Sequence, residues 1–181
     1  MPVMTKQMKI IYVFVIAGIL FSTACGHTEE NTKKEPAVIQ PADSAETTVP
    51  GVDKLPFTDT IHLKAGNEMR FDQELFRIRT GKKIRLTLTN TAAKSNLSMT
   101  HNVVVLAKGT DIADFADAVH NAKDEQYVPA SVAPLVIAHT GMVAGGDSGE
   151  VEFTISKPGV YDYICSFPGH WGTMQGKIVA E

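Results

Sequence analysis

The chain has 181 residues, of which 44% are hydrophobic and 20% are charged, a composition typical of a globular protein. Its 17 Lys and Arg residues against 20 Asp and Glu residues give a formal charge of −3, so it lacks the basic surplus that nucleic-acid binding needs. It has two cysteines, Cys25 and Cys165, which excludes a disulfide-stapled miniprotein and a zinc ribbon built from two Cys pairs.

Residues 1–24 have the pattern of a signal peptide. Lys6 and Lys9 precede an apolar run at residues 10–21. As a helix, about twelve residues rise only about 18 Å, well short of the roughly 30 Å hydrocarbon core of a bilayer. A permanent membrane span is therefore the weaker interpretation.

The end of this leader resembles the lipobox of bacterial lipoproteins. Ser22, Thr23 and Ala24 precede Cys25, although Ser22 stands where Leu is usual. We expect cleavage before Cys25 and lipidation of its thiol, because an exposed free thiol is a liability in an oxidising compartment. The alternative is ordinary cleavage near Ala24, which would leave that thiol free.

Residues 25–56 predict the lipidated Cys25 followed by a flexible tether. The segment 26–56 contains four prolines and no aromatic residue, so it cannot bury enough apolar surface to fold. About 30 residues of flexible coil have an r.m.s. reach of roughly 30 Å, enough to hold a domain clear of a membrane. His27 is expected to be a solvated linker residue.

From Phe57 onward the pattern changes to short alternating runs separated by turn signals. Residues 76–79 and 84–89 alternate on either side of a turn at 80–83, as expected of a half-buried hairpin. Seven or eight short strands at this spacing predict a β-sandwich or barrel over residues 57–181. The further runs lie at 101–106, 133–139, 150–155, 160–164 and 176–180.

One segment has the period of a helix instead. Ile112, Phe115, Ala116 and Val119 are spaced i, i+3, i+4 and i+7, and Thr110 is the expected N-cap. This predicts a single helical flap inserted between strands. The Gly-rich segment 141–149 lacks the Gly-Lys-Ser/Thr ending and the following helix of a phosphate loop, so we expect it to connect strands.

A loop near the C-terminus combines three side chains that can bind a metal. Cys165, His170 and Met174 lie within ten residues, between two predicted strands. Thiolate, imidazole and thioether together are ligands that copper prefers, whereas Met is a poor ligand for zinc. The Pro168-Gly169 turn can fold His170 back toward Cys165.

A blue-copper centre needs a second histidine, and His101 is the candidate. It begins a predicted strand in which His101 faces one side and Asn102 the other. Cys165 alone could be a small buried hydrophobe and His170 alone a surface residue, but together these donors predict a copper site. No second cluster for a catalytic copper is evident, since the remaining histidines are scattered at His27, His62, His120 and His139.

Three segments resemble the azurin family of bacterial cupredoxins. They are Met-Thr-His-Asn at 99–102, Val-Ile-Ala-His-Thr at 136–140, and 165–174, whose C-x4-H-x3-M spacing is specific to this blue-copper group. The resemblance spans about residues 58–181. It implies an all-β, Greek-key sandwich or barrel of the cupredoxin type with one inserted helix, and one type 1 copper per chain.

The resemblance also implies a ligand set. Copper would be held by His101, Cys165 and His170, with Met174 as a weak axial ligand and the backbone carbonyl of Thr100 on the opposite side. Such a set leaves no open position for a substrate, whereas catalytic metal sites keep one vacant. We therefore expect electron transfer and no enzymatic activity.

The resemblance also implies supporting roles for two residues near the Cys165 sulfur. Asn102 would tie the two ligand-bearing segments together. The backbone N–H groups of Asn102 and Phe167 would donate to the Cys165 sulfur and tune its donation to the metal.

Three positions depart from the family pattern. Thr100 replaces the usual Gly before the first ligand, which leaves the axial geometry and the reduction potential open. Asn90 stands where some azurins have a titrating His, so we expect little pH-linked change from that position. Val103 stands where Trp is common, and the azurin disulfide is absent, as the cysteine count requires.

The resemblance implies an apolar docking patch around the edge of the His170 ring. Its expected neighbours are Met69, Met99, Phe167 and Trp171, and Trp171 could equally be a packing residue. Such a patch suits brief encounters between redox proteins. The partners implied are c-type cytochromes or copper- or haem-containing reductases and oxidases, with no nucleic acid and no small-molecule substrate.

These features predict a blue-copper electron carrier on the periplasmic side of the bacterial cell envelope, anchored to a membrane through lipid on Cys25. Two other functions stay open. A copper chaperone or storage lipoprotein would bind the same metal but would exchange it quickly. A reductase would need a further metal centre supplied by another chain.

Overall fold

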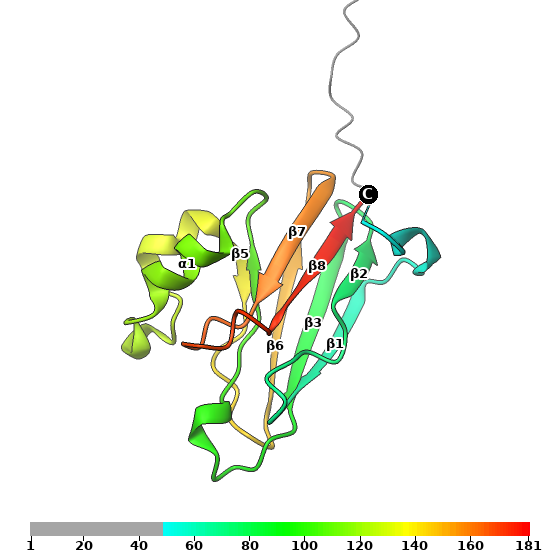
Figure 1. Ribbon diagram of the computed structural model, residues 1–181. Helices are drawn as coiled ribbons and strands as arrows, with labels where there is room; N and C mark the ends of the chain where they lie inside the picture. Colours follow the sequence, from blue (N-terminus) through cyan, green and yellow to red (C-terminus); the bar gives the residue numbers. More distant parts are fainter. Residues whose placement is uncertain (1–48) are drawn as a thin grey trace, which may run out of the picture. The chain divides into compact units, whose positions relative to one another are not determined.

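The computed structural model describes residues 49–181. The predicted signal peptide, the lipidation site Cys25 and the tether as far as residue 48 lie outside the described residues. Within 49–181, eight strands form two sheets, and one α-helix, α1 (Ile112–Val119), lies to the side of them (Figure 1). In this part of the chain, no helix has the length and apolar character needed to cross a membrane.

The smaller sheet has the strand order β1-β3-β6. Its strands are β1 (Thr60–Ala65), β3 (Lys83–Asn90) and β6 (Ser148–Thr154), and β3 runs parallel to β1 and antiparallel to β6. The larger sheet has the order β2-β8-β7-β4-β5, in which β2 and β8 are parallel and the other neighbours antiparallel. Its strands are β2 (Leu75–Ile78), β4 (Val104–Leu106), β5 (Val136–His139), β7 (Gly159–Ile164) and β8 (Gln175–Ala180).

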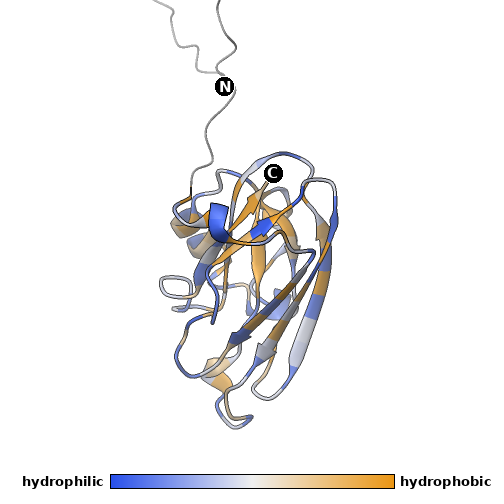
Figure 2. Ribbon diagram, turned by 90° about the vertical axis from the view of Figure 1, so that its right-hand side faces the viewer, coloured by the Kyte–Doolittle hydropathy of each residue, from blue (hydrophilic) through white to orange (hydrophobic). Residues whose placement is uncertain are grey.

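The main core fills the space between the two sheets. In β3, Ile84, Leu86 and Leu88 are fully buried and alternate with more exposed residues, as the period of two predicts. They pack in one cluster with residues of the opposite sheet such as Phe76 and Ile178. Figure 2 shows this alternation of apolar and polar residues along the strands. The predicted β-sandwich with one inserted helix is confirmed.

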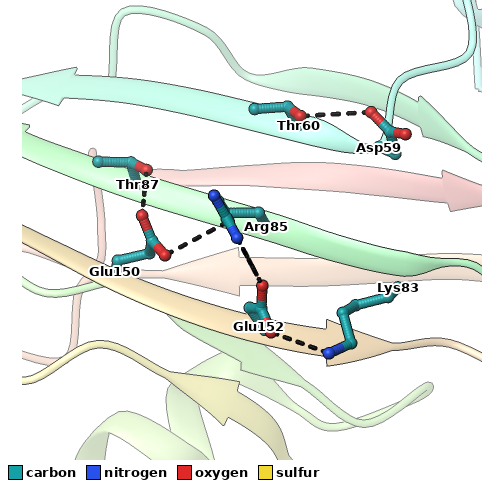
Figure 3. A network of polar contacts seen from close by, with 7 residues as sticks. All are labelled: Asp59, Thr60, Lys83, Arg85, Thr87, Glu150 and Glu152. Carbon is teal, nitrogen blue, oxygen red and sulfur yellow. Dashed lines mark hydrogen bonds and ion pairs between the residues drawn. The ribbon is translucent and has the colours of Figure 1, made fainter.

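The outer face of the smaller sheet is polar. Arg85 lies between Glu150 and Glu152 of the neighbouring strand, and Lys83 contacts Glu152 at 3.0 Å (Figure 3). These side chains are exposed, so solvent screens the ion pairs and they contribute little to stability. Their main effect is to keep this face hydrated while the opposite face of the sheet is buried.

The predicted hairpin between residues 76–79 and 84–89 is wrong. β2 pairs with β8 in the larger sheet, whereas β3 pairs with β1 and β6 in the smaller one. The turn between them carries the chain across the sandwich, and it is held where Thr80 N–H donates to Glu181 O and Gly81 N–H donates to Ile155 O, both at 2.8 Å. This crossing lets the apolar faces of both strands meet across the core, which pairing within one sheet would prevent.

Two other predicted strands are shorter than their patterns suggested. In the segment 101–106 the strand begins at Val104, and His101 forms an isolated bridge with Val143. Residues 133–135 belong to a 3-10 helix, η4 (Ala130–Leu135). The other 3-10 helices are η1 (Val52–Lys54), η2 (Leu97–Met99) and η3 (Lys123–Glu125).

The packed part of the chain also begins earlier than Phe57. Val52 is buried, and η1 contacts β2. Val52 lies in a segment rich in proline and polar residues, so the sequence pattern did not reveal its burial.

Helix α1 begins one residue away from the expected cap. The Asp111 carboxylate accepts hydrogen bonds from Ala113 N–H at 2.9 Å and Asp114 N–H at 3.0 Å, so Asp111 is the N-cap. The Thr110 hydroxyl instead donates to Ala107 O. The apolar stripe of the helix packs over the larger sheet in a second cluster that includes Phe115, Val119, Val104, Leu106, Val132 and Ile164.

Candidate metal centre

Three metal-binding side chains from two distant segments converge in the interior. His101 and Cys165 are fully buried, and His170 is 4% exposed. Their donor atoms all lie within 4.8 Å of one another. The His101 Nδ1 to His170 Nδ1 distance is 3.2 Å, and the Cys165 Sγ to His170 Nδ1 distance is 3.8 Å.

His101 is held by its backbone and by its second ring nitrogen. Its N–H donates to Val143 O at 3.1 Å, and Val143 N–H donates back to His101 O at 2.7 Å. The ring Nε2 lies 3.0 Å from Gly66 O. Since a carbonyl only accepts, Nε2 carries the proton, which leaves the Nδ1 lone pair free to face Cys165 and His170.

The loop 165–174 closes on itself. Cys165 N–H donates to Met174 O at 3.0 Å, and Met174 N–H donates to His170 O at 2.9 Å. Gly169, with φ 84°, makes the left-handed turn that folds His170 back, as the Pro-Gly pair predicted. Met174 is fully buried at the end of this loop, directly before β8.

Asn102 joins the two segments that carry the donors. Its Nδ2 donates to Ser166 Oγ, and its Oδ1 accepts from Ser166 N–H, both at 2.8 Å. This pair of bonds fixes the residue after His101 to the residue after Cys165. Both side chains are buried, so water does not compete for the bonds.

Burial shifts the proton equilibria of all three donors. It raises the pKa of Cys165 to about 11, although the backbone N–H groups of Asn102 and Phe167 act in the opposite direction. Burial is also the main reason why the pKa of His170 falls to about 4, with the charge of His101 adding to the effect and a Ser98 backbone hydrogen bond opposing it. Burial likewise lowers the pKa of His101, against its bond to Gly66. Both imidazoles are therefore neutral at pH 7, as metal ligands must be.

The donor spacing fits a metal ion in the plane of the three side chains. Two nitrogens about 2.0–2.1 Å from an ion and about 120° apart are separated by about 3.5 Å, and a nitrogen and a thiolate by about 3.8 Å. The distances of 3.2 and 3.8 Å between the donors agree with these values to within a few tenths of an ångström. Two imidazoles and a thiolate in this arrangement are the trigonal donor set of blue copper sites.

The half-buried Thr100 side chain bonds to the short helix η2 that precedes it. Its hydroxyl donates to Leu97 O at 3.0 Å, and its backbone is extended, with φ −87° and ψ 133°, immediately before His101. The side chain is thus accommodated by the turn of η2 and does not replace any hydrogen bond of His101.

The sequence did not reveal the supporting roles of two residues, Gly66 and Asn90. Gly66 supplies the carbonyl that holds His101, and a Cβ at this position would collide with the Thr91 hydroxyl. Asn90 is buried, and its Nδ2 donates to Met99 O at 2.7 Å and to Val143 O at 2.9 Å. A signal for Asn90 existed, because it occupies the next inward position after Ile84, Leu86 and Leu88 in the alternation of β3.

The surface beside the centre differs in part from the expected docking patch. Met69, Met99, Phe167 and Trp171 are all half-buried, and the edge of His170 is nearly covered. Trp171 packs against the second cluster beneath helix α1, which supports its packing role. Among residues 49–181, the most exposed large apolar side chain is Leu97 in η2, which is 75% exposed and was not anticipated.

The fold and the buried donor set define a blue copper protein of the cupredoxin class. Within that class, residues 59–181 match the family of copper binding proteins described as the plastocyanin/azurin family, and the chain belongs to it. The cupredoxin fold and a single type 1 copper site are thereby confirmed. Proteins of this kind transfer electrons, and so does this one.

Several proteins are similar over the same region. Azurin from Alcaligenes faecalis is 33% identical over 122 residues, which cover 65% of this chain and 94% of the azurin. Auracyanin-B from Chloroflexus aurantiacus is 34% identical over 114 residues, but these make up 47% of its length. Outer membrane protein H.8 from Neisseria meningitidis is 32% identical over 120 residues, 64% of each chain.

Solved structures share the fold. The reduced auracyanin from Roseiflexus castenholzii superimposes with a TM-score of 0.62 at 29% identity, covering 70% of this chain and 99% of that one. The family match at residues 59–181 leaves residues 1–58 uncovered.

Proposed function

We propose that the protein carries single electrons between redox proteins of the bacterial cell envelope. Copper would be held by His101 Nδ1, Cys165 Sγ and His170 Nδ1, with Met174 and the Thr100 carbonyl as weaker donors. The observation that carries the proposal is the buried cluster of three donors within 4.8 Å. The bound ion supplies one-electron chemistry between its cupric and cuprous states.

The residues around the donors suit a carrier because they resist rearrangement. The hydrogen bonds of Gly66, Asn102 and the closed 165–174 loop hold the donors at binding distance. A site that moves little between two oxidation states has a small reorganisation cost, which favours fast outer-sphere transfer. With four side-chain donors assigned, no coordination position is set aside for a substrate, and we expect no enzymatic turnover.

Partners would dock over the nearly covered edge of His170. Leu97 is the most exposed apolar residue of this surface, and Met69, Met99 and Phe167 are half-buried around it, with Trp171 at the rim. Thr173 Oγ1 donates to Met69 O at 2.8 Å, which holds Met69 beside the metal loop. A small apolar surface supports the weak, short-lived complexes that c-type cytochromes or copper- or haem-containing reductases and oxidases form.

The envelope location is proposed from the sequence. A signal peptide at 1–24 and lipid on Cys25 would place the domain on a tether at the periplasmic side of a membrane, and one similar protein bears the name outer membrane protein. In cells, we expect the full-length chain in the membrane fraction and the Cys25→Ser variant in the soluble fraction. An equal distribution of both would rule out the lipid anchor.

The experiment that tests the carrier function mixes the reduced, copper-loaded protein with oxidised cytochrome c in a stopped-flow spectrometer. We expect transfer of one electron per chain, with no consumption of nitrite or oxygen. The Leu97→Asp variant should slow the transfer about tenfold at an unchanged reduction potential, whereas Leu135→Asp, at an apolar position 39% exposed, should not. Slow electron transfer combined with loss of copper to a chelator within seconds would instead favour a copper chaperone or storage protein.

A further inference from the structure

One aromatic side chain of the flap that carries helix α1 contacts Phe167 of the metal loop. The ring of Tyr127, which follows η3, contacts the Phe167 ring edge-on, with centroids 5.4 Å apart and an interplanar angle of 66°. The Phe167 ring in turn lies against the imidazole of His170, with centroids 4.6 Å apart and an angle of 34°. Tyr127, Phe167 and His170 therefore form a continuous row of rings from the flap to a metal donor.

The backbone at this point is held in an unfavourable conformation. Gln126 and Tyr127 have φ values of 53° and 57°, in the left-handed region that residues with side chains seldom adopt. Two such residues in succession persist only when the surroundings impose them, and they concentrate at functional sites. Here Tyr127 N–H donates to Ala122 O at 2.9 Å, and Gln126 Oε1 accepts from Met142 N–H at 2.9 Å. The strained turn is thus hydrogen-bonded both to the flap and to the loop after β5.

Phe167 is the residue through which the flap can act on the donors. Its backbone N–H acts to lower the pKa of the Cys165 thiol, and its carbonyl accepts from His170 N–H at 3.0 Å. Its ring covers one face of the His170 imidazole. Holding Phe167 in place therefore holds two of the three buried donors.

We propose that Tyr127 is a positioning residue of the metal centre. The Tyr127 ring holds the Phe167 ring against the His170 imidazole. The strained turn at 126–127 sets the orientation of the Tyr127 ring. The inference rests on the copper site proposed above but concerns residues that bind no metal. It predicts that a change more than thirty residues from the metal loop alters the properties of the metal centre.

The test compares Tyr127→Ala and Tyr127→Phe with Val128→Ala as a matched control. Val128 neighbours Tyr127 in the flap and packs against the second cluster, whereas Phe167 packs against the main core. Two quantities are measured: the flip rate of the Phe167 ring in the metal-free protein by NMR, and the rate of copper release to a chelator from the loaded protein. The reduction potential and the copper EPR spectrum of each loaded variant are recorded alongside.

We expect Tyr127→Ala to speed ring flipping and to raise copper release by about two- to tenfold, the range that one aromatic pair supports. Its EPR spectrum and potential should also shift, Tyr127→Phe should restore all values, and Val128→Ala should change only the melting temperature. This role of Tyr127 is refuted if Tyr127→Ala matches the wild type, if Tyr127→Phe behaves like Tyr127→Ala, or if Val128→Ala produces the same shifts. If the wild type failed to bind copper as proposed, the flip rate of the Phe167 ring in the metal-free protein would still test whether Tyr127 restrains that ring.

Discussion

Gly66 shows how one backbone carbonyl can fix a metal donor. Its oxygen lies 3.0 Å from His101 Nε2, and a Cβ at this position would collide with the Thr91 hydroxyl. Gly66→Ala should therefore displace the carbonyl and reorient the imidazole. Because partners of metal-binding histidines typically affect metal affinity by about 10–100-fold, we expect roughly a tenfold loss in competition titrations with a copper chelator.

A matched control for this substitution lies in the metal loop itself. A Cβ on Gly172 would meet nothing within 4 Å, so Gly172→Ala should bind copper as the wild type does. Equal affinities for Gly66→Ala and Gly172→Ala would show that the Gly66 carbonyl does not position His101.

His170 makes the stability of the metal-free protein depend on pH. Its pKa is about 4 in the folded state, against an ordinary value of 6.5 in the unfolded chain. Between these values the unfolded chain binds more protons, so stability is complete above pH 6.5 and is lost as the pH falls toward 4. At about 1.4 kcal/mol per pKa unit, we expect a loss of roughly 3 kcal/mol in the free energy of unfolding.

Urea denaturation of the metal-free protein across this pH range measures the effect. The His170→Gln variant has no imidazole at this position and should lose correspondingly less stability than the wild type. Parallel stability curves for the two proteins would mean that burial of His170 does not set the pH dependence.

At the scale of elements, Asn90 at the end of β3 holds two loops of the metal centre together. It donates to Met99 O and Val143 O, and its Oδ1 accepts from Ala92 N–H at 2.9 Å. Asn90→Leu keeps a similar volume but leaves these buried groups unpaired, which should lower the free energy of unfolding by about 2–4 kcal/mol. Thr89→Val, which removes an exposed hydrogen bond to Ser148, should cost less than about 1 kcal/mol in the same denaturation experiment.

Equal stabilities for these two variants would contradict the structural role of Asn90.

Position 90 also bears on pH dependence near the metal, since the amide of Asn90 does not titrate. The expectation of little pH-linked change from position 90 therefore stays a prediction. The structure adds that Asn90 holds two loops of the metal centre together.

The alternating pattern predicted burial better than it predicted pairing. In β3 the inward positions were readable from the sequence, because the period of two alone decides which side chains share a face. The partner of each strand was not readable, and the proposed hairpin of β2 and β3 proved to be a crossing between sheets. A two-residue shift in pairing leaves the pattern unchanged, so pairing depends on the long-range core and on turn contacts such as Thr80 with Glu181.

At the scale of the whole molecule, the metal loop was recognisable because its donors are close in sequence. Cys165 and His170 lie five residues apart, and soft donors at that spacing favour copper. His101 required the resemblance and the strand pattern, since the chain between position 101 and the loop contains the whole flap. Gly66 and Tyr127 could not have been found, because their roles depend on contacts between segments that only the folded sandwich brings together.

The most direct test of the copper assignment is the visible and EPR spectrum of the purified soluble domain after addition of Cu(II). We predict one copper per chain, an intense blue thiolate-to-copper band that bleaches on reduction, and loss of this band in Cys165→Ser. A pale protein with an ordinary tetragonal copper signal, or a blue band that survives in Cys165→Ser, would contradict it.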